Sequence, residues 1–250
     1  MCSYLVDFSQ KVEIAGLKHL FEENGFLHLK NILDKSELSK IRETILNEFE
    51  MLDSNVNLTE PDKRILDRCE MPVVHENCPR IDKNCYSALI NSQLPCVLKE
   101  IYGEDFLWHF PPQIRRLSVT KNNGLLPYHQ DYYYNAIYEN IIVCWTPLVD
   151  CGTTSPSIEL VRTTVKEKIK HESNETWEFG ISPESMERHL KNYEEIALKN
   201  VNIGDVVIFD AYNLHRTFWN KEMTDTRYSM DLRTVKKSFV SDELINSRKY

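Results

Sequence analysis

The sequence LPYHQDYYYN, residues 126–135, places a histidine and an aspartate two positions apart, at His129 and Asp131. In a β-strand, side chains two positions apart point to the same face, so the imidazole and the carboxylate would lie side by side. A second histidine would complete the two-histidine, one-carboxylate set that holds Fe(II) and leaves three coordination positions open. Because this short pattern arises by chance in many chains, an isolated match is more often structural than metal-binding. The prediction of a metal site therefore depends on a third ligand.

The best candidate for the third ligand is His215, which follows the apolar sequence GDVVIFDAYNL and begins the strand candidate HRTFW. A ligand there would come from a separate strand, far along the chain, as a jelly roll allows. The other histidines fall in a helical region, in an irregular stretch, before a Phe-Pro-Pro sequence, or in a charged insertion (His19, His28, His75, His109, His171 and His189).

Arg227 and Ser229 lie two positions apart in the strand candidate that follows His215. If the sequence WNKEMTD turns the chain near residue 221, His215 and Arg227 would lie opposite each other in a hairpin. A guanidinium binds a carboxylate through two parallel hydrogen bonds, so Arg227 could hold an anion beside the metal. The alternative is an arginine in a surface salt bridge, which is the commoner situation for any single arginine.

The elements that would position these residues begin with a helical flank, residues 1–103. Apolar residues at helical spacing predict helices over residues 11–25, 34–52 and 86–102, and a short strand over 26–29. Asp34, followed three residues later by Glu37, is typical of a helix start. Gly25 is a natural helix end.

From residue 104 to about 240 the pattern changes to short, β-branched or aromatic segments separated by turn residues. Many short strands without alternating helices predict an antiparallel jelly roll, the double-stranded β-helix of cupin-like proteins. The charged residues 163–193 interrupt these strands, and we expect them to form an insertion with a helix that begins after Ser182. A long insertion in a compact domain is often a lid over a binding site. The whole chain, 1–250, is predicted to be a single domain.

Composition excludes several classes of function. The net charge is −8 and the pI about 5.6, so no basic surface for nucleic acid is expected. Seven cysteines, an odd number without a Cys-x-x-Cys pair, favour free thiols over a disulfide framework or a zinc ribbon. No segment has the pattern of a signal peptide or of a membrane span. We therefore expect a cytoplasmic protein with a small-molecule substrate and no membrane partner; the oligomeric state is left open.

The order of these motifs resembles the phytanoyl-CoA dioxygenase-like family of Fe(II)- and 2-oxoglutarate-dependent oxygenases. The resemblance rests on LKHLFEENGFLHLKNILDKSELSKIRETI, LPYHQD, CWTPLVDC and GDVVIFDAYNLHRTFWN, which follow the family's order and spacing over most of the chain. The chain departs from the family pattern after CWTPLVDC, where SPSIELVRTTVKEKIKH replaces a Pro-Gly-Ser-His stretch that is common in the family. This departure concerns the pocket wall, and with it the substrate.

The resemblance implies a role for each site residue. His129, Asp131 and His215 would bind Fe(II). Arg227 would bind the distal carboxylate of 2-oxoglutarate with Ser229 beside it, and Gln130 and Trp145 would lie near the same co-substrate. The implied reaction uses O₂, converts 2-oxoglutarate to succinate and hydroxylates an unactivated carbon of a small-molecule metabolite.

Two other classes of function stay open. The same ligands could serve a cupin-like metal enzyme that uses no 2-oxoglutarate, although Arg227 with Ser229 argues against it. A non-catalytic binding protein could also carry this fold, but the set of polar site residues favours an enzyme. Side chains that could line the pocket include tyrosines 132 to 134 and one of two adjacent arginines (Tyr132, Tyr133, Tyr134, Arg115 and Arg116).

Overall fold

The computed structural model describes most of the chain: residues 4–54, 87–119, 125–133, 141–163, 166–172, 180–191 and 193–240. Tyr134, and most of the polar stretch 52–80 that contains His75, lie outside the described residues. None of the helices in the described part is long and apolar enough to cross a membrane.

Six strands form the larger sheet, in the order β1-β2-β7-β4-β9-β3. They are β1 (Leu5–Asp7), β2 (Phe26–Lys30), β3 (Phe106–Leu117), β4 (Ile141–Pro147), β7 (Val206–Asp210) and β9 (Arg227–Lys236). All neighbours pair antiparallel except β1 and β2, which are parallel. The first two strands come from the region predicted as a helical flank, so this region also extends the sheet.

Three strands form the smaller sheet, in the order β6-β5-β8. They are β5 (Ser157–Arg162), β6 (Glu194–Ala197) and β8 (His215–Phe218). Apolar side chains from both sheets pack together in one buried cluster, with Trp145, Val207 and Phe209 from the larger sheet and Ile158 and Leu160 from the smaller one. The two sheets therefore face each other across a shared core. They remain separate rather than closing into a barrel, and the predicted mainly β fold with a helical flank and a jelly-roll core is confirmed.

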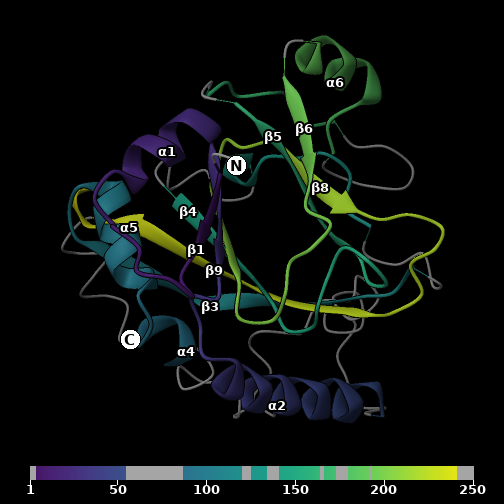
Figure 1. The fold of residues 1–250 in the computed structure, drawn as a ribbon. Coiled ribbons are helices and arrows are strands. Elements are labelled where there is room, and N and C mark those ends of the chain that lie inside the picture. Colours follow the sequence, from purple (N-terminus) through teal and green to yellow (C-terminus); the bar gives the residue numbers. More distant parts are fainter. Residues whose placement is uncertain are drawn as a thin grey trace.

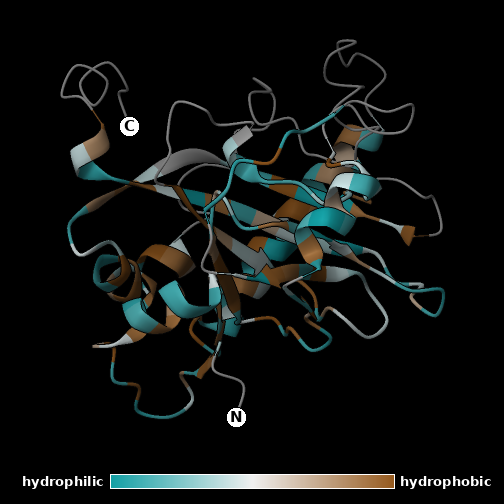
Figure 2. Cartoon of the chain, turned by 90° about the horizontal axis from the view of Figure 1, so that it is seen from above, coloured by the Kyte–Doolittle hydropathy of each residue, from teal (hydrophilic) through white to brown (hydrophobic). Residues whose placement is uncertain are grey.

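Four helices of the described part pack on the outer face of the larger sheet: α1 (Leu17–Asn24), α2 (Lys35–Asp53), α4 (Ser87–Ile90) and α5 (Leu94–Tyr102). Their buried residues, among them Phe21, Ile45 and Leu98, join sheet residues such as Ile208 and Leu232 in a second core cluster. Figure 1 shows α1, α4 and α5 on one side of the fold and the strands β5, β6 and β8 on the other. Figure 2 shows both hydrophobic and hydrophilic residues on the helices of the fold, as expected for helices between core and solvent.

Local sequence explains where the helices begin and end. Gly16 and Gly25 have positive φ angles of 96° and 75° and flank α1. Asp34 accepts hydrogen bonds from the backbone of Ser36 and Glu37 at the start of α2, as its spacing predicts. The single helix predicted over 86–102 is divided into α4 and α5. Pro95, the second residue of α5, explains the division. Proline has no backbone N–H to donate and its ring clashes with the preceding turn, so it is tolerated in the first turn of a helix but not in the interior.

Two predictions about the strands are wrong. The sequence over residues 126–133 is not a continuous strand: His129 makes one isolated bridge, and residues Asp131–Tyr133 form a 3-10 turn, η3. The strands β8 and β9 also do not form a hairpin, because β8 pairs with β5 in the smaller sheet while β9 pairs with β3 and β4 in the larger one. The segment between them passes from one sheet to the other.

The described part of the predicted insertion is packed rather than extended into solvent. Its helix, α6 (Pro183–Leu190), begins after Ser182, which accepts a hydrogen bond from the backbone of Ser185 as a helix cap. Ile169, Ile181 and Met186 are buried together with Tyr128 and Leu214, next to the metal-ligand candidates. The described residues of the insertion therefore pack against the chain segments that carry His129 and His215.

Candidate metal and co-substrate site

Three side chains from two distant segments of the chain meet between the two sheets. The ligand atoms of His129, Asp131 and His215 all lie within 4.8 Å of one another, and all three residues are buried. The backbones of His129 and His215 bridge each other, with hydrogen bonds of 3.0 and 3.1 Å between N and O atoms. Asp131 then opens the turn η3, which brings its carboxylate to the same side as the two imidazoles. The turn, rather than the predicted strand alternation, thus produces the cluster.

Backbone carbonyl groups fix the orientation of both imidazoles. His129 Nδ1 lies 2.8 Å from the carbonyl oxygen of Pro127, and His215 Nδ1 lies 3.0 Å from that of Asn213. Because a carbonyl oxygen can only accept, each Nδ1 must carry the proton. Each Nε2 is then left with its lone pair, which is the form that binds a metal.

The protonation states also suit metal binding. Burial lowers the pKa of His129 to about 3, and burial likewise lowers the pKa of His215. Burial alone would raise the pKa of Asp131, but the positive charge of Arg233, followed by the fields of the two histidines, outweighs it and holds the pKa well below its usual range. At neutral pH the cluster therefore contains two neutral imidazoles and one carboxylate.

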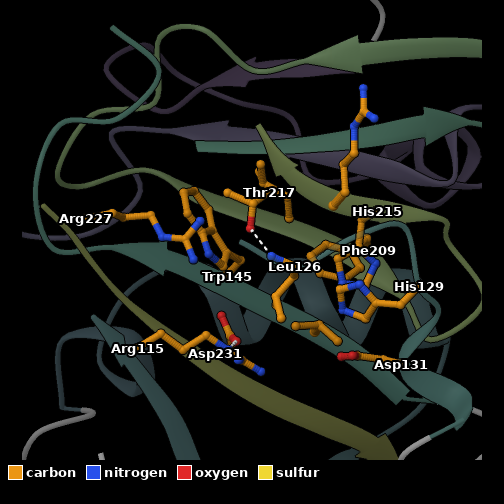
Figure 3. Close-up of a pocket in the computed structure, with 13 residues that line it drawn as sticks. Arg115, Leu126, His129, Asp131, Trp145, Phe209, His215, Thr217, Arg227 and Asp231 are labelled. Carbon is orange, nitrogen blue, oxygen red and sulfur yellow. Dashed lines mark hydrogen bonds and ion pairs between the residues drawn. The ribbon is translucent and has the colours of Figure 1, made fainter. Parts of the chain in front are cut away.

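Arg227 lines the same cavity as these three residues. Figure 3 shows Arg227 and Trp145 at one end and His129, His215 and Asp131 at the other. Arg227 is 3% exposed; its guanidinium donates to the backbone oxygen of Ser157 at 3.1 Å and lies 5.7 Å from the centre of the Trp145 ring.

Arg227 has no salt bridge to any carboxylate in the described part of the chain, and its Nε has no hydrogen-bond partner there. The buried hydroxyl of Ser229, two positions along β9, also lacks a partner among those residues. Burial lowers the pKa of Arg227, yet an arginine keeps its charge in proteins. A buried cation without a counter-charge is costly, so this end of the cavity is suited to an anion.

The side chain of Gln130 does not line this cavity. Its amide nitrogen donates to the backbone oxygens of Glu167 and Tyr212, and its amide oxygen accepts from the backbone of Ile169 at 2.9 Å. His171 Nε2 accepts from the backbone N–H of Gln130 at 2.9 Å. The amide of Gln130 is thus used to bind the insertion, and its position does not support the predicted contact with a co-substrate.

Of the remaining candidates with described side chains, one lines the cavity and two do not. Tyr132 donates to the backbone oxygen of Ile169 and stacks on Tyr212, so it packs against the insertion. Arg116 binds Asp53 and lies over the ring of Phe49, on the outer face of the sheet. Arg115 is the one of the two adjacent arginines that lines the cavity.

Two pairs in the site were not predicted. Arg233 Nη2 lies 3.2 Å from Asp131 Oδ2, and Arg115 Nε lies 3.0 Å from Asp231 Oδ2. The signal in the sequence is the alternation of polar residues in RYSMDLR, which places Arg227, Ser229, Asp231 and Arg233 on one face of β9. Four buried polar residues on the same face of a central strand indicate a site rather than a core.

The fold and the cluster place the chain among jelly-roll proteins with a candidate metal site of two histidines and one carboxylate. A model of the phytanoyl-CoA dioxygenase family matches residues 21–224. The chain therefore belongs to the phytanoyl-CoA dioxygenase family, and the family predicted from the sequence is confirmed.

Three solved structures share the fold at low sequence identity. EctD from S. alaskensis, solved with 2-oxoglutarate and 5-hydroxyectoine, is 14% identical, with a TM-score of 0.60 over 92% of this chain and 79% of its own. The carbocyclase SnoK from nogalamycin biosynthesis is 13% identical, with a TM-score of 0.59 over 91% and 85%. The epimerase SnoN, solved with Fe³⁺, α-ketoglutarate and nogalamycin RO, is 12% identical, with a TM-score of 0.58 over 88% and 82%.

Proposed function

We propose that this protein is an Fe(II)- and 2-oxoglutarate-dependent dioxygenase that hydroxylates an unactivated carbon of a small-molecule metabolite. The observation that carries the proposal is the shared cavity. The cluster of His129, Asp131 and His215 lies at one end, and at the other lies the buried Arg227, which has no carboxylate partner among the residues that the structure describes. Membership of the family and the neighbours solved with iron and 2-oxoglutarate support it.

The residues present fit both groups. Two imidazoles with Nε2 lone pairs and one ionised carboxylate form the donor set that non-haem Fe(II) sites use, with positions left for a co-substrate and O₂. Arg227 would bind the distal carboxylate of 2-oxoglutarate, because a guanidinium matches a carboxylate in shape and charge. The hydroxyl of Ser229 would donate to the same carboxylate, and the Trp145 ring would pack against the carbon chain.

When bound, the iron centre supplies the oxidation chemistry, with O₂ as oxidant and 2-oxoglutarate as the source of two electrons. The contribution of the protein is positioning. Pro127 and Asn213 orient the two imidazoles through their carbonyl groups, Arg233 orients the Asp131 carboxylate, and the apolar side chains of Val143, Ile158 and Phe209 exclude water from the cavity.

The choice of hydroxylation over halogenation rests on Asp131. If Asp131 held the metal, no position would be left for the halide that halogenation needs, so a hydroxyl group would be the one transferred. The neighbours with this fold include a carbocyclase and an epimerase, and an assay of the product distinguishes hydroxylation from those reactions. A metal enzyme without 2-oxoglutarate is the second reading, but it leaves Arg227 buried without an anion.

The test is succinate formation by the purified protein with Fe(II), 2-oxoglutarate and O₂. We expect succinate from the wild type and almost none from His129→Ala or His215→Ala, because each variant removes one of three protein ligands. His19→Ala, at a solvent-exposed position of α1, is the control and should match the wild type. Equal succinate yields from His215→Ala and the wild type would refute the metal assignment. Bound Fe(II) without any consumption of 2-oxoglutarate would favour the second reading.

A further inference from the structure

A second charged pair lies in the same cavity and has no role in the proposed binding of metal or co-substrate. Arg115 on β3 and Asp231 on β9 are joined by a contact of 3.0 Å between Nε and Oδ2. Both side chains line the cavity, and Figure 3 shows them next to each other along one side of it. Asp231 lies midway along β9 between Arg227 and Arg233, which contacts Asp131.

One oxygen of Asp231 is left without a hydrogen bond. Oδ2 accepts from Arg115, whereas the buried Oδ1 has no partner among the residues that the structure describes. Asp231 is only 8% exposed, so bulk water does not replace a partner for it. Because an unsatisfied buried carboxylate oxygen is costly, Oδ1 is ready to accept a hydrogen bond from a molecule that enters the cavity.

The co-substrate cannot supply this hydrogen bond. Both carboxylates of 2-oxoglutarate are anionic at neutral pH, and its keto oxygen only accepts. Repulsion between like charges is strong where water is excluded. The donor must therefore come from the primary substrate, which enters the same cavity.

The charge of Asp231 selects the kind of donor. Among the charged side chains at the cavity, Asp231 is paired with Arg115, and Arg216 is paired with Glu159. Fe(II) and the 2-oxoglutarate dianion would add equal and opposite charges. Because Arg115 already balances the charge of Asp231, its free oxygen needs no cationic partner, and a hydroxyl group donates a hydrogen bond without adding charge.

We propose that Asp231, held in place by Arg115, binds a hydroxyl group of a neutral alcohol or polyol substrate beside the carbon that is oxidised. The inference rests on the proposed function only for the presence of 2-oxoglutarate in the cavity. It predicts that a hydrocarbon chain without a hydroxyl group binds less well at this point.

The test measures binding without turnover. Protein loaded with diamagnetic Zn(II) and 2-oxoglutarate is mixed with D-glucose, myo-inositol and 1,2-hexanediol, and with hexanoate and hexylamine as comparison compounds. Saturation-transfer NMR then reports which molecules bind. The variant is the double substitution Arg115→Met with Asp231→Leu, which removes the pair without leaving one buried charge alone. The matched control is Arg162→Met with Glu194→Leu. These two side chains form an exposed ion pair, with 3.4 Å between Nη1 and Oε2, and neither lines the cavity.

We expect a signal from at least one hydroxylated compound with the wild type and the control, and a loss of about tenfold in affinity in the Arg115 and Asp231 variant, the effect of losing a hydrogen bond to a charged group. Equal affinity in that variant, or binding of only hexanoate or hexylamine, would refute the proposal, as would no binding of any hydroxylated compound. The 2-oxoglutarate signal in the same spectra tests the proposed function separately, because its absence from the wild type would count against the co-substrate site alone.

Discussion

The guanidinium of Arg233 binds the carboxylate of Asp131, with 3.2 Å between Nη2 and Oδ2, and both side chains are buried. Arg233 also donates to Gln113 Oε1 at 2.9 Å, so it is held from two sides. The pair therefore holds the Asp131 carboxylate in a fixed orientation beside the two imidazoles, where it could bind a metal.

Arg233 should control the pH range of metal binding. The arginine opposes the effect of burial on Asp131, so Arg233→Gln should raise the pKa of that carboxyl. Because only the ionised carboxylate binds metal, the pH at which half of the Mn(II) binding is lost should move upward. A titration of Mn(II) affinity against pH measures this shift. Arg162→Gln, at an exposed ion pair, is the control; a midpoint that stays at the wild-type pH in Arg233→Gln would show that the pair has no such effect.

Arg227 should dominate the affinity for 2-oxoglutarate. Removal of one partner of a buried charge pair costs about 2–5 kcal/mol, so Arg227→Met should weaken binding roughly 30-fold or more. Arg227→Lys should lie between, because an ammonium cannot form two parallel hydrogen bonds. Isothermal titration with 2-oxoglutarate in the presence of Mn(II) gives these affinities. If Arg227→Met binds 2-oxoglutarate normally and Arg115→Met does not, the distal carboxylate of 2-oxoglutarate lies against Arg115 instead.

Gln130 should stabilise the insertion rather than bind co-substrate. Gln130→Ala removes three hydrogen bonds to the backbones of Glu167, Ile169 and Tyr212. Groups left unpaired in this way cost about 1–3 kcal/mol in the free energy of unfolding, and residues 166–172 should become open to proteases. Gln10→Ala, at an exposed position, is the control. Wild-type stability together with a weakened affinity for 2-oxoglutarate would restore the role that the sequence predicted.

The metal-free protein should lose stability as the pH falls. The pKa of His129 drops from 6.5 to about 3 on folding, so between these values the unfolded chain binds a proton that the folded chain does not. The stabilisation is present above pH 6.5 and is lost as the pH approaches 3, by about 1.4 kcal/mol per pH unit for each such histidine. Urea unfolding at several pH values checks the slope, and His129→Gln should reduce it. An unchanged slope in this variant would mean that His129 is protonated in the folded protein.

The strands and the identity of the metal-ligand candidates could be predicted from the sequence because both depend on local pattern. The apolar sequences NIIVCWTPLV and DVVIF became β4 and β7, as β-branched residues between turns predict. The spacing of His129 and Asp131 identified a metal-ligand pair even though the backbone there turns instead of extending. In the structure, the turn η3 rather than strand alternation brings the carboxylate of Asp131 to the two imidazoles.

The partners of these residues could not be predicted, because they depend on contacts between distant segments. Spacing alone placed His215 opposite Arg227 in a hairpin, whereas the chain between them crosses from one sheet to the other. The amide of Gln130 meets an insertion about 40 residues further along the chain, at Ile169. Arg115 and Asp231 meet only because β3 and β9 pair in the sheet.

A crystal structure with Mn(II) and 2-oxoglutarate tests the central claim most directly, because Mn(II) replaces Fe(II) without oxidation. We predict anomalous density for the metal between His129 Nε2, His215 Nε2 and one oxygen of Asp131, with the distal carboxylate of 2-oxoglutarate on the guanidinium of Arg227 and the hydroxyl of Ser229. A metal bound elsewhere, or a metal at this cluster with no 2-oxoglutarate against Arg227 at saturating concentration, would contradict the account.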